Sequence, residues 1–385
     1  MKRITILGAT GSIGGSTADV VLRHADQFEV YALVGHRNHV RMLEMAQKLR
    51  PQWVVMTDAA SAAALDGLLP EGTQLGRDMD AAIVTATDPC VDIVLAAMVG
   101  AVGLPAALAA VHAGKRVALA NKECLVTAGR LFMQAAAVSG ADVVPVDSEH
   151  AAVHQCLSGH DSASVRRVIL TASGGPFRDR DPATMENITP EEAVAHPNWD
   201  MGAKISIDSA TLMNNALELI VARWLFDIEP DKLSAVIHPQ SIVHGMVEYT
   251  DGSVVAQLAE PDMRGPIAYA LQMKPRLASG IPFLDLAGHG KLEFQAVDEY
   301  RFPAMSLVRH VLAGSDSLAI TFNAANETAN ASFRERRIGF MEIVRIVERV
   351  MQDSEDVSVQ TLDEVWSRDR ESRAFTESVI QSFGG

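Results

Sequence analysis

The sequence is poor in cysteine, in aromatic residues and in positive charge. Its three cysteines, Cys90, Cys124 and Cys156, include no C-x-x-C pair, so neither a disulfide framework nor a zinc knuckle is expected. Aromatic residues make up 5% of the chain, whereas 48% of it is hydrophobic and 21% charged, as in ordinary globular proteins. The formal net charge of -15 argues against a nucleic-acid partner, which needs a basic surface.

The chain also lacks a long uninterrupted apolar run. The nearest is 91–114, which Asp92, Gly100, Pro105 and His112 interrupt. We therefore expect a buried helix, a turn and a second helix there, and no membrane span. The first three residues lead directly into a strand-like run, so we expect no signal peptide. With so few cysteines, a reducing cytoplasm is the expected location.

The length of 385 residues predicts two or three domains. Residues 1–147 alternate short β-branched runs with longer alanine-rich stretches. This alternation predicts an α/β fold with a Rossmann-like parallel sheet that is covered on both faces. The expected strands are 4–7, 30–34, 53–56, 82–85, 116–119 and 143–146.

The pattern changes after this first domain. Residues 148–272 mix strand-like runs at 167–171, 233–237 and 253–258 with helices and Gly-rich or Asn-rich loops, which predicts a central α+β catalytic domain. Residues 273–298 contain several Pro and Gly residues with little periodicity and predict an extended linker. Helical spacing of apolar residues predicts a C-terminal helical domain at 299–385.

A glycine-rich turn follows the first strand. The segment GATGSIG (8–14) leads into a helical stretch at 16–22, so the helix N-terminus can offer free N–H groups to a pyrophosphate. Its G-x-x-G-x-x-G spacing differs from the commonest dinucleotide fingerprint, and a turn that serves only packing is the alternative. The second strand ends at Gly35-His36-Arg37-Asn38. An Arg there suits a 2'-phosphate and favours NADPH over NADH, unless Arg37 is a surface residue without this role.

Acidic residues follow another predicted strand. Asp147 and Glu149 come just after 143–146, and in an extended chain residues two apart share one face. Both carboxylates could then point into the crevice at the carboxyl edge of the sheet. The alternative is that they cap a helix.

A third acid lies farther along the chain. Glu218 is set among apolar residues with no Lys or Arg four residues away on either side, and such an acid is costly to bury unless something pairs with it. Thr211, Asn214 and Glu218 follow an i, i+3, i+7 spacing, which predicts one polar helical stripe. Asp208 and Ser209 are expected at the N-terminus of that helix, where a phosphate could bind. A solvated polar face is the alternative.

Two further segments carry histidines. The loop HPNWDMG (196–202) places Trp199 between turn-forming residues and could form a lid over a substrate, although an ordinary packed Trp explains it equally well. His238 and His244 flank a strand-like segment in HPQSIVHG. A lone His in that setting is more often structural than catalytic.

These segments together resemble the 1-deoxy-D-xylulose 5-phosphate reductoisomerase family over nearly the whole chain. The matching motifs are GATGSIGGST, ALANKE, VPVDSEH, ASGGPF, HPNWDMG, KISIDSAT, HPQSIVHG, QLAEPDMR and NAANE. The resemblance implies NADPH-dependent and metal-dependent conversion of 1-deoxy-D-xylulose 5-phosphate to 2-C-methyl-D-erythritol 4-phosphate, a step of non-mevalonate isoprenoid biosynthesis. It also implies a homodimer, with the central domain as a plausible contact surface.

The resemblance assigns roles to individual residues. It implies that a Mg or Mn ion is bound by Asp147, Glu149 and Glu218, with catalytic roles shared by these three, Lys122, His196 and His244. It implies that NADPH contacts Gly8, Thr10, Gly11, Ser12, Ile13, Gly35, Arg37, Asn38, Asn121, Glu123, Gly202 and Met263. It implies that the substrate contacts Lys122, Ser148, Glu149, Ser173, His196, Trp199, Ser209, Asn214, Asn215 and Glu218.

The implied chemistry has a physical logic. The metal polarises the substrate carbonyl and stabilises an oxyanion while the carbon skeleton rearranges, by retro-aldol and aldol steps or by a direct α-ketol shift. NADPH then reduces the resulting aldehyde, and a flap containing His196, Trp199 and Met201 closes over the reactive intermediates.

This chain departs from the family pattern at one implied phosphate contact. The family usually has M-N-K-G where this sequence has MNNA (213–216), so a Lys is replaced by Asn215. A hydrogen bond to a charged group contributes about 1.5 to 3 kcal/mol, which predicts weaker phosphate binding unless another cation, for which Lys204 is a candidate, compensates. Replacing Asn215 with Lys should then lower the Michaelis constant. Ala172 also stands where the family commonly has Gly.

Other functions fit the sequence less well. A short-chain dehydrogenase needs a Tyr-x-x-x-Lys pair, and none of the four tyrosines is followed by Lys at that spacing. A semialdehyde dehydrogenase needs a nucleophilic Cys, and Cys156 lacks suitable neighbours. A catalytically weak NADPH-binding sensor of the same fold is the remaining alternative.

Overall fold

The computed structural model describes residues 1–199 and 201–383, and it divides into two compact units. Unit 1 comprises Met1–Cys124, Phe132–His154 and Asp262–Phe283. Unit 2 comprises Leu125–Leu131, Gln155–Pro261 and Leu284–Gly385. Both units are assembled from separate stretches of chain. The four-part functional division at 147, 272 and 298 stays a prediction, because compactness alone does not show where function changes.

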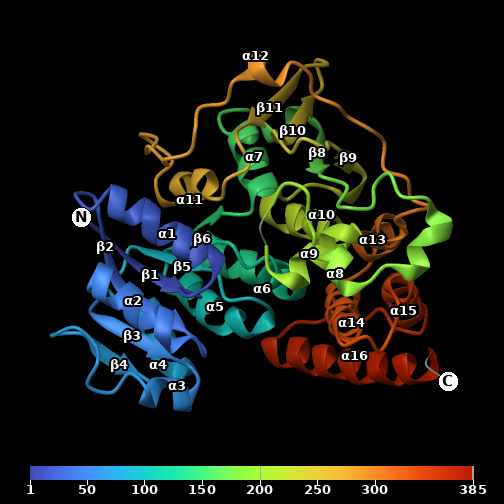
Figure 1. Ribbon diagram of the computed structural model, residues 1–385. Helices are drawn as coiled ribbons and strands as arrows, with labels where there is room; N and C mark the ends of the chain where they lie inside the picture. Colours follow the sequence, from blue (N-terminus) through green and yellow to red (C-terminus); the bar gives the residue numbers. More distant parts are fainter. Residues whose placement is uncertain (200, 384–385) are drawn as a thin grey trace. The chain divides into compact units, whose positions relative to one another are not determined.

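A seven-stranded parallel sheet forms the centre of unit 1, in the order β4-β3-β2-β1-β5-β6-β7 (Figure 1). The order reverses beside β1, so the edge where β1 and β5 end is the crevice in which such sheets bind ligands. The fold class predicted from the sequence is confirmed. The strands are β1 Lys2–Leu7, β2 Phe28–Gly35, β3 Trp53–Met56, β4 Gln74–Gly76, β5 Ile93–Ala96, β6 Arg116–Leu119 and β7 Asp142–Pro145.

The helices of unit 1 form two contacting groups, α1 with α2 and α11, and α4 with α5. Two groups are expected where a parallel sheet is covered on both faces. The helices are α1 Ser12–Arg23, α2 His39–Leu49, α3 Ala59–Ala63, α4 Met79–Thr87, α5 Leu104–His112 and α11 Arg264–Leu271, with a 3-10 turn at Ala101–Gly103. Helix α6 Glu123–Ser139 belongs to unit 1 except for Leu125–Leu131, which is assigned to unit 2, and α7 Ser148–Leu157 begins in unit 1 and ends in unit 2.

Two predictions for this sheet were wrong. The expected strand at 82–85 lies inside α4, and the expected first helix of 91–114 contains β5. The segment Ile93–Ala96 is buried throughout, and a short, fully buried strand has no alternating pattern that distinguishes it from a helix. The edge strand β4 was not predicted. No helix in the described part of the chain is long and apolar enough to cross a membrane, as predicted.

Unit 2 contains a mixed four-stranded sheet in the order β11-β10-β8-β9. Strand β10 pairs antiparallel with β8 and with β11, while β8 and β9 are parallel. The strands are β8 Val165–Ala172, β9 Leu233–Ile237, β10 Val243–Tyr249 and β11 Val254–Leu258. Three of them match the predicted runs, and β10 contains His244, which the sequence placed beside a strand.

Helices dominate the rest of unit 2. The long helix α14 Asp316–Arg334 packs against α15 Phe340–Gln352, α16 Leu362–Phe383 and α9 Ala203–Ala210 (Figure 1). The remaining helices are α8 Pro190–Ala193, α10 Met213–Phe226, α12 Leu286–His289 and α13 Ala304–Ala313, with 3-10 turns at Ser162–Ser164, Pro182–Asn187 and Pro230–Lys232. The helical character predicted for 299–385 is confirmed as far as residue 383, and 273–298 has little regular structure apart from the short α12.

Candidate active site

The glycine-rich turn after β1 is shaped by close backbone contacts. Gly8 has φ of 85°, and a Cβ there would lie 2.3 Å from the carbonyl oxygen of Ala97. A Cβ on Gly14 would lie 2.1 Å from the carbonyl oxygen of Ala9. Gly11 is the N-cap residue of α1, and no described side chain caps this helix. The N–H groups of its first turn, at Ser12 and Ile13, therefore point toward the carboxyl edge of the sheet, where an anion can accept from them.

The end of β2 presents one exposed cation. The Arg37 side chain is 78% exposed, and its Nε lies 3.8 Å from Oδ1 of Asp58. Asn38 accepts a hydrogen bond from the backbone N–H of Arg41 at 3.1 Å and so caps α2. Gly35 packs tightly, because a Cβ there would lie 2.6 Å from Cε of Met42. Arg37 thus has room to meet a phosphate, whereas Asn38 already has a structural role.

Asn121 follows β6 with one half of its amide satisfied. Its Nδ2 donates to the carbonyl oxygen of Gly100 at 2.9 Å. Its Oδ1 is buried and has no hydrogen-bond partner among the described residues. A buried acceptor without a donor is costly, so this position suits a ligand that brings an N–H group. The neighbouring Glu123 begins α6 and is buried.

Asp147 is held between two basic side chains. Its Oδ1 lies 3.1 Å from Nζ of Lys122, which is 7% exposed, and its Oδ2 lies 2.6 Å from Nδ1 of His150. Burial alone raises the pKa of Asp147, but the charge of Lys122 and the contact with His150 outweigh burial, and the pKa ends below its ordinary value. Asp147 is therefore ionised at neutral pH.

Glu149 is the opposite case. Burial, together with the nearby charge of Asp147, raises the pKa of Glu149 to about 7 although Lys122 opposes the shift. Its Oε2 accepts from the hydroxyl of Ser148 at 2.8 Å. The prediction that an extended chain presents both acids was wrong, because α7 begins at Ser148 and the carbonyl of Asp147 accepts from the N–H of Ala151. The two acids lie in and just before the first helical turn.

Two side-chain amides of its own helix donate hydrogen bonds to Glu218. Nδ2 of Asn215 donates to one carboxylate oxygen of Glu218 at 2.8 Å, and Nδ2 of Asn214 donates to the other. Asn215 is buried and also points its Nδ2 at the carbonyl of Thr171, 3.4 Å away. The predicted single stripe from Thr211 to Glu218 was wrong, because Leu212 has φ of 57° and separates α9 from α10.

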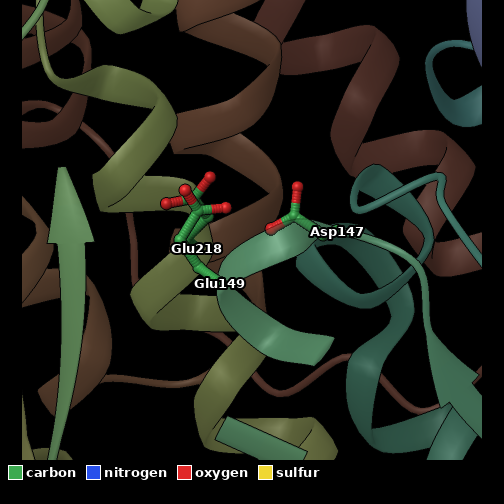
Figure 2. A group of neighbouring side chains, drawn as sticks. All are labelled: Asp147, Glu149 and Glu218. Carbon is green, nitrogen blue, oxygen red and sulfur yellow. The ribbon is translucent and has the colours of Figure 1, made fainter. Parts of the chain in front are cut away.

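The three acids form one group. Asp147, Glu149 and Glu218 each offer a carboxylate oxygen, and these three atoms lie within 4.8 Å of one another (Figure 2). Carboxylate oxygens are the donors that hard divalent cations prefer. Three carboxylates this close repel one another unless positive charge compensates, so the donor set fits a divalent cation.

Ser173 and His196 form a second polar group. Nδ1 of His196 accepts the N–H groups of Asn198 at 3.2 Å and Trp199 at 3.0 Å, which assigns the ring proton to Nε2. Nε2 then donates to Oγ of Ser173 at 2.8 Å, and Oγ also accepts from the N–H of Gly175 at 3.1 Å. With both contacts accepted, the hydroxyl hydrogen of Ser173 remains to donate to an anion. Burial, followed by the charge of Arg178, lowers the pKa of His196 to about 4.

The other predicted residues occupy varied positions. His244 is buried in β10 with its ring centroid 6.3 Å from that of Trp199, and burial lowers its pKa to about 4. His238 is structural, because Nδ1 donates to the carbonyl of Glu293 at 2.7 Å and Nε2 accepts from the N–H of Ile242 at 3.1 Å. Asp200 lies outside the described residues.

Three of the predicted contacts lie at helix termini. Met263 is the N-cap residue of α11, in unit 1. Gly202 is the N-cap residue of α9, in unit 2, and Ser209 lies near the C-terminal end of the same helix, so the expected place of Asp208 and Ser209 at a helix N-terminus was wrong. The left-handed conformation of Leu212, which ends this polar run, has no signal in the sequence.

Sequence reasoning missed the role of His150 and the contacts of Asp208. His150 contacts Asp147, and its i+3 spacing in the DSEH motif could have indicated this. Asp208 receives two amide donors from α14. No local pattern predicts that second contact, because its partners lie more than a hundred positions away in the chain.

Comparison with known proteins places this arrangement in a family. Three family models of 1-deoxy-D-xylulose 5-phosphate reductoisomerase match residues 4–129, 143–226 and 258–375, the last two describing C-terminal domains. The chain belongs to the 1-deoxy-D-xylulose 5-phosphate reductoisomerase family. The resemblance predicted from the motifs is confirmed.

Similar proteins cover nearly the whole chain. The reductoisomerase of Pseudomonas paraeruginosa is 48% identical over 100% of this chain and 99% of its own, and that of Pseudomonas aeruginosa is 49% identical over 97% and 96%. A solved reductoisomerase in complex with NADPH, fosmidomycin and magnesium has a TM-score of 0.93 at 39% identity, covering 99% of this chain and 98% of the other. The enzyme from Zymomonas mobilis in complex with NADPH has the same score at 41% identity, covering 99% of both chains.

Proposed function

We propose that this chain converts 1-deoxy-D-xylulose 5-phosphate to 2-C-methyl-D-erythritol 4-phosphate, using NADPH and a divalent cation, Mg or Mn, in non-mevalonate isoprenoid biosynthesis. Relatives that are named for this activity align with the chain over almost their full lengths. The observation that carries the proposal is the group of three carboxylates, Asp147, Glu149 and Glu218. A simple NADPH-binding sensor has no need for such a group.

The proposed metal ligands are these three acids. Asp147 is ionised, and the two carboxyl oxygens of Glu218 each accept a hydrogen bond from an amide. His150 and Lys122 hold Asp147 from both sides, and Asn214 and Asn215 hold Glu218, so each ligand is oriented by neighbours. When bound, the cation polarises the carbonyl and hydroxyl oxygens of the substrate and NADPH supplies the hydride.

The proposed phosphate site lies in unit 2. Ser173 has its hydroxyl hydrogen available, and His196 holds that hydroxyl in place without carrying charge at neutral pH. Ser209 and Asn214 are the other proposed donors to the phosphate. Asn215 is directed at Glu218 and at the Thr171 carbonyl, so we propose that it contributes to the site through Glu218. Trp199 and Met201 belong to the proposed flap that excludes water, with His244 behind it.

Most residues of the proposed NADPH site belong to unit 1. The N–H groups at the start of α1, with Gly8, Thr10 and Gly11, suit the pyrophosphate, while Arg37 suits the 2'-phosphate. The buried Oδ1 of Asn121 suits a nicotinamide N–H group. Gly35, Asn38, Glu123, Gly202 and Met263 are the remaining proposed neighbours of the cofactor. Lys122, beside Asp147, is proposed to donate a proton to oxygen as negative charge develops on the substrate.

We further propose a homodimer that contacts through residues 148–272, in the cytoplasm. The test of the activity is to incubate the purified chain with NADPH, Mn²⁺ and 1-deoxy-D-xylulose 5-phosphate and to identify the product by NMR. The expected result is NADPH oxidation and stoichiometric 2-C-methyl-D-erythritol 4-phosphate. Tight NADPH binding with no oxidation in Mn²⁺ or Mg²⁺ would instead favour the sensor.

A further inference from the structure

Three asparagines form a buried polar stripe on α14. Asn323, Asn326 and Asn330 are each 0% exposed, and their i, i+3, i+7 spacing places them on one face of the helix. The first two belong to the NAANE motif, to which the proposed function gives no role. A buried amide is costly unless it forms hydrogen bonds, so the contacts of these side chains indicate what the stripe is for.

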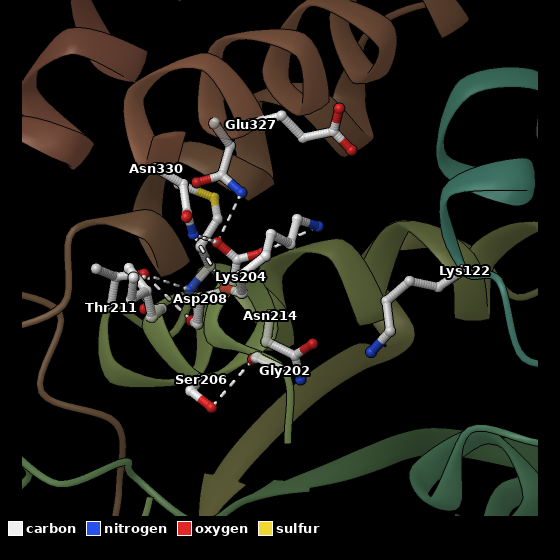
Figure 3. A network of polar contacts seen from close by, with 12 residues as sticks. Lys122, Gly202, Lys204, Ser206, Asp208, Thr211, Asn214, Glu327 and Asn330 are labelled. Carbon is white, nitrogen blue, oxygen red and sulfur yellow. Dashed lines mark hydrogen bonds and ion pairs between the residues drawn. The ribbon is translucent and has the colours of Figure 1, made fainter. Parts of the chain in front are cut away.

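Two of the three asparagines donate to one carboxylate. Nδ2 of Asn326 donates to Oδ1 of Asp208 at 3.0 Å. Nδ2 of Asn330 donates to the same oxygen at 2.8 Å (Figure 3). Asn330 also donates to the backbone carbonyl of Lys204 at 3.0 Å. The other oxygen of Asp208, Oδ2, lies 3.1 Å from Nζ of Lys204. The carboxylate accepts only, so both amides must present their nitrogen to it.

Asp208 occupies a position that α9 itself disfavours. It lies in the last turn of the helix, where the dipole repels negative charge, and its side chain is only 2% exposed. The charge of the Asp208 carboxylate is stabilised by two amides, both from α14, and by the ammonium group of Lys204. These hydrogen bonds therefore fix the C-terminal end of α9 to α14 through the two Nδ2 groups, while Oδ1 of Asn326 and of Asn330 is buried without a partner among the described residues.

The end of α9 is the point on which the proposed phosphate site depends. Ser209 is the next residue after Asp208, and Leu212, with φ of 57°, turns the chain into α10, which begins with Asn214 in its first turn. We propose that Asp208, held by Asn326 and Asn330, is a positioning residue that sets Ser209 and Asn214 for the substrate phosphate. This inference rests on the proposed function, which it extends from the site to the helix behind it.

Substitutions on one face of α14 test the positioning role of Asp208 and include an internal control. Asn326→Leu and Asn330→Leu remove the amides that hold Asp208. Asn323→Leu makes the same change at an equally buried position whose Nδ2 and Oδ1 have no partner among the described residues. Asp208→Asn, which keeps an acceptor oxygen of the same shape, should retain more function than Asp208→Leu.

Steady-state kinetics give the first readout. In Asn330→Leu the KM for 1-deoxy-D-xylulose 5-phosphate and the inhibition constant of inorganic phosphate should both rise about tenfold, equivalent to about 1.4 kcal/mol, while kcat changes less. The dissociation constant of NADPH should stay unchanged, and Asn323→Leu should behave as the parent chain. Equal kinetic effects of Asn323→Leu and Asn330→Leu would overturn the inference, since burial alone would then explain them.

Hydrogen exchange gives a readout that needs no activity. Backbone amides of 203–218 should exchange faster in Asn330→Leu than in Asn323→Leu, without ligands. Unchanged exchange at these residues would overturn the positioning role even if the enzyme is active. If the parent chain shows no turnover, the proposed function fails, whereas the exchange result still judges whether α14 orders the end of α9.

Discussion

The two units build their candidate ligand sites in different ways. In unit 1 the proposed cofactor site consists mainly of backbone: a glycine turn after β1, the N–H groups that begin α1, and strand ends. In unit 2 the proposed phosphate and metal residues are side chains that hydrogen-bond to one another, as His196 does to Ser173 and Asn215 to Glu218. Side-chain substitutions should therefore weaken ligand binding less in unit 1 than in unit 2, because a backbone N–H group remains when the side chain is replaced.

The carboxylate group should show the largest effect of any single substitution. Asp147→Asn removes a proposed ligand while it keeps the shape of the side chain. Loss of a residue that merely orients a ligand costs about 10- to 100-fold, so loss of the ligand should lower kcat/KM by at least about a hundredfold. Steady-state NADPH oxidation measures this. Asp142→Asn, in the strand just before Asp147 and paired with Arg116, is the matched control and should change kcat/KM little.

Arg37 tests the proposed 2'-phosphate contact of unit 1. Arg37→Ala should raise the KM for NADPH by about 10- to 100-fold, because a hydrogen bond to a charged group contributes about 1.5 to 3 kcal/mol. The KM for NADH, which lacks the 2'-phosphate, should not change. Arg77→Ala, an exposed arginine of the same unit, is the control. Equal losses with NADPH and NADH would place the 2'-phosphate elsewhere.

Asn215 tests the network of unit 2. Asn215→Lys adds a cation and, by the prediction made from the sequence, should lower the substrate KM by about tenfold. Asn215→Leu should weaken Mn²⁺ binding instead, because it removes the amide that donates to Glu218. An unchanged or higher KM in Asn215→Lys would refute the phosphate argument and leave the contact with Glu218 as the role of this residue.

The buried His244 should make the stability of the protein depend on pH. Its pKa of about 4 lies below the ordinary value of 6.5, so between these values the unfolded chain binds more protons at this position than the folded chain. The free energy of unfolding should therefore rise as pH increases from about 4 to 6.5, by at most about 3 kcal/mol, since one pKa unit corresponds to about 1.4 kcal/mol. Denaturant unfolding at several pH values measures this. His244→Gln should show a flatter profile, and an identical slope would contradict the buried, neutral state.

Features with a local sequence signal could be predicted, whereas contacts between distant segments could not. The glycine turn, five of the seven parallel strands and the motif-bearing acids have local signals in the sequence. The edge strand β4 was missed, and β5 was misassigned because a four-residue buried run has no alternating pattern. The extended presentation of Asp147 and Glu149 was wrong because α7 begins immediately after β7. The hydrogen bonds from Asn326 and Asn330 to Asp208 could not be predicted, because they depend on how α14 packs on α9.

Mn²⁺ binding tests the central claim most directly, since it requires neither substrate nor turnover. Titration followed by electron paramagnetic resonance should find one tightly bound Mn²⁺ per parent chain. Asp147→Asn and Glu218→Gln, which alter acids far apart in sequence, should each abolish that tight binding. If Glu218→Gln bound Mn²⁺ as tightly as the parent chain, these carboxylates would not share one cation and the account would be contradicted.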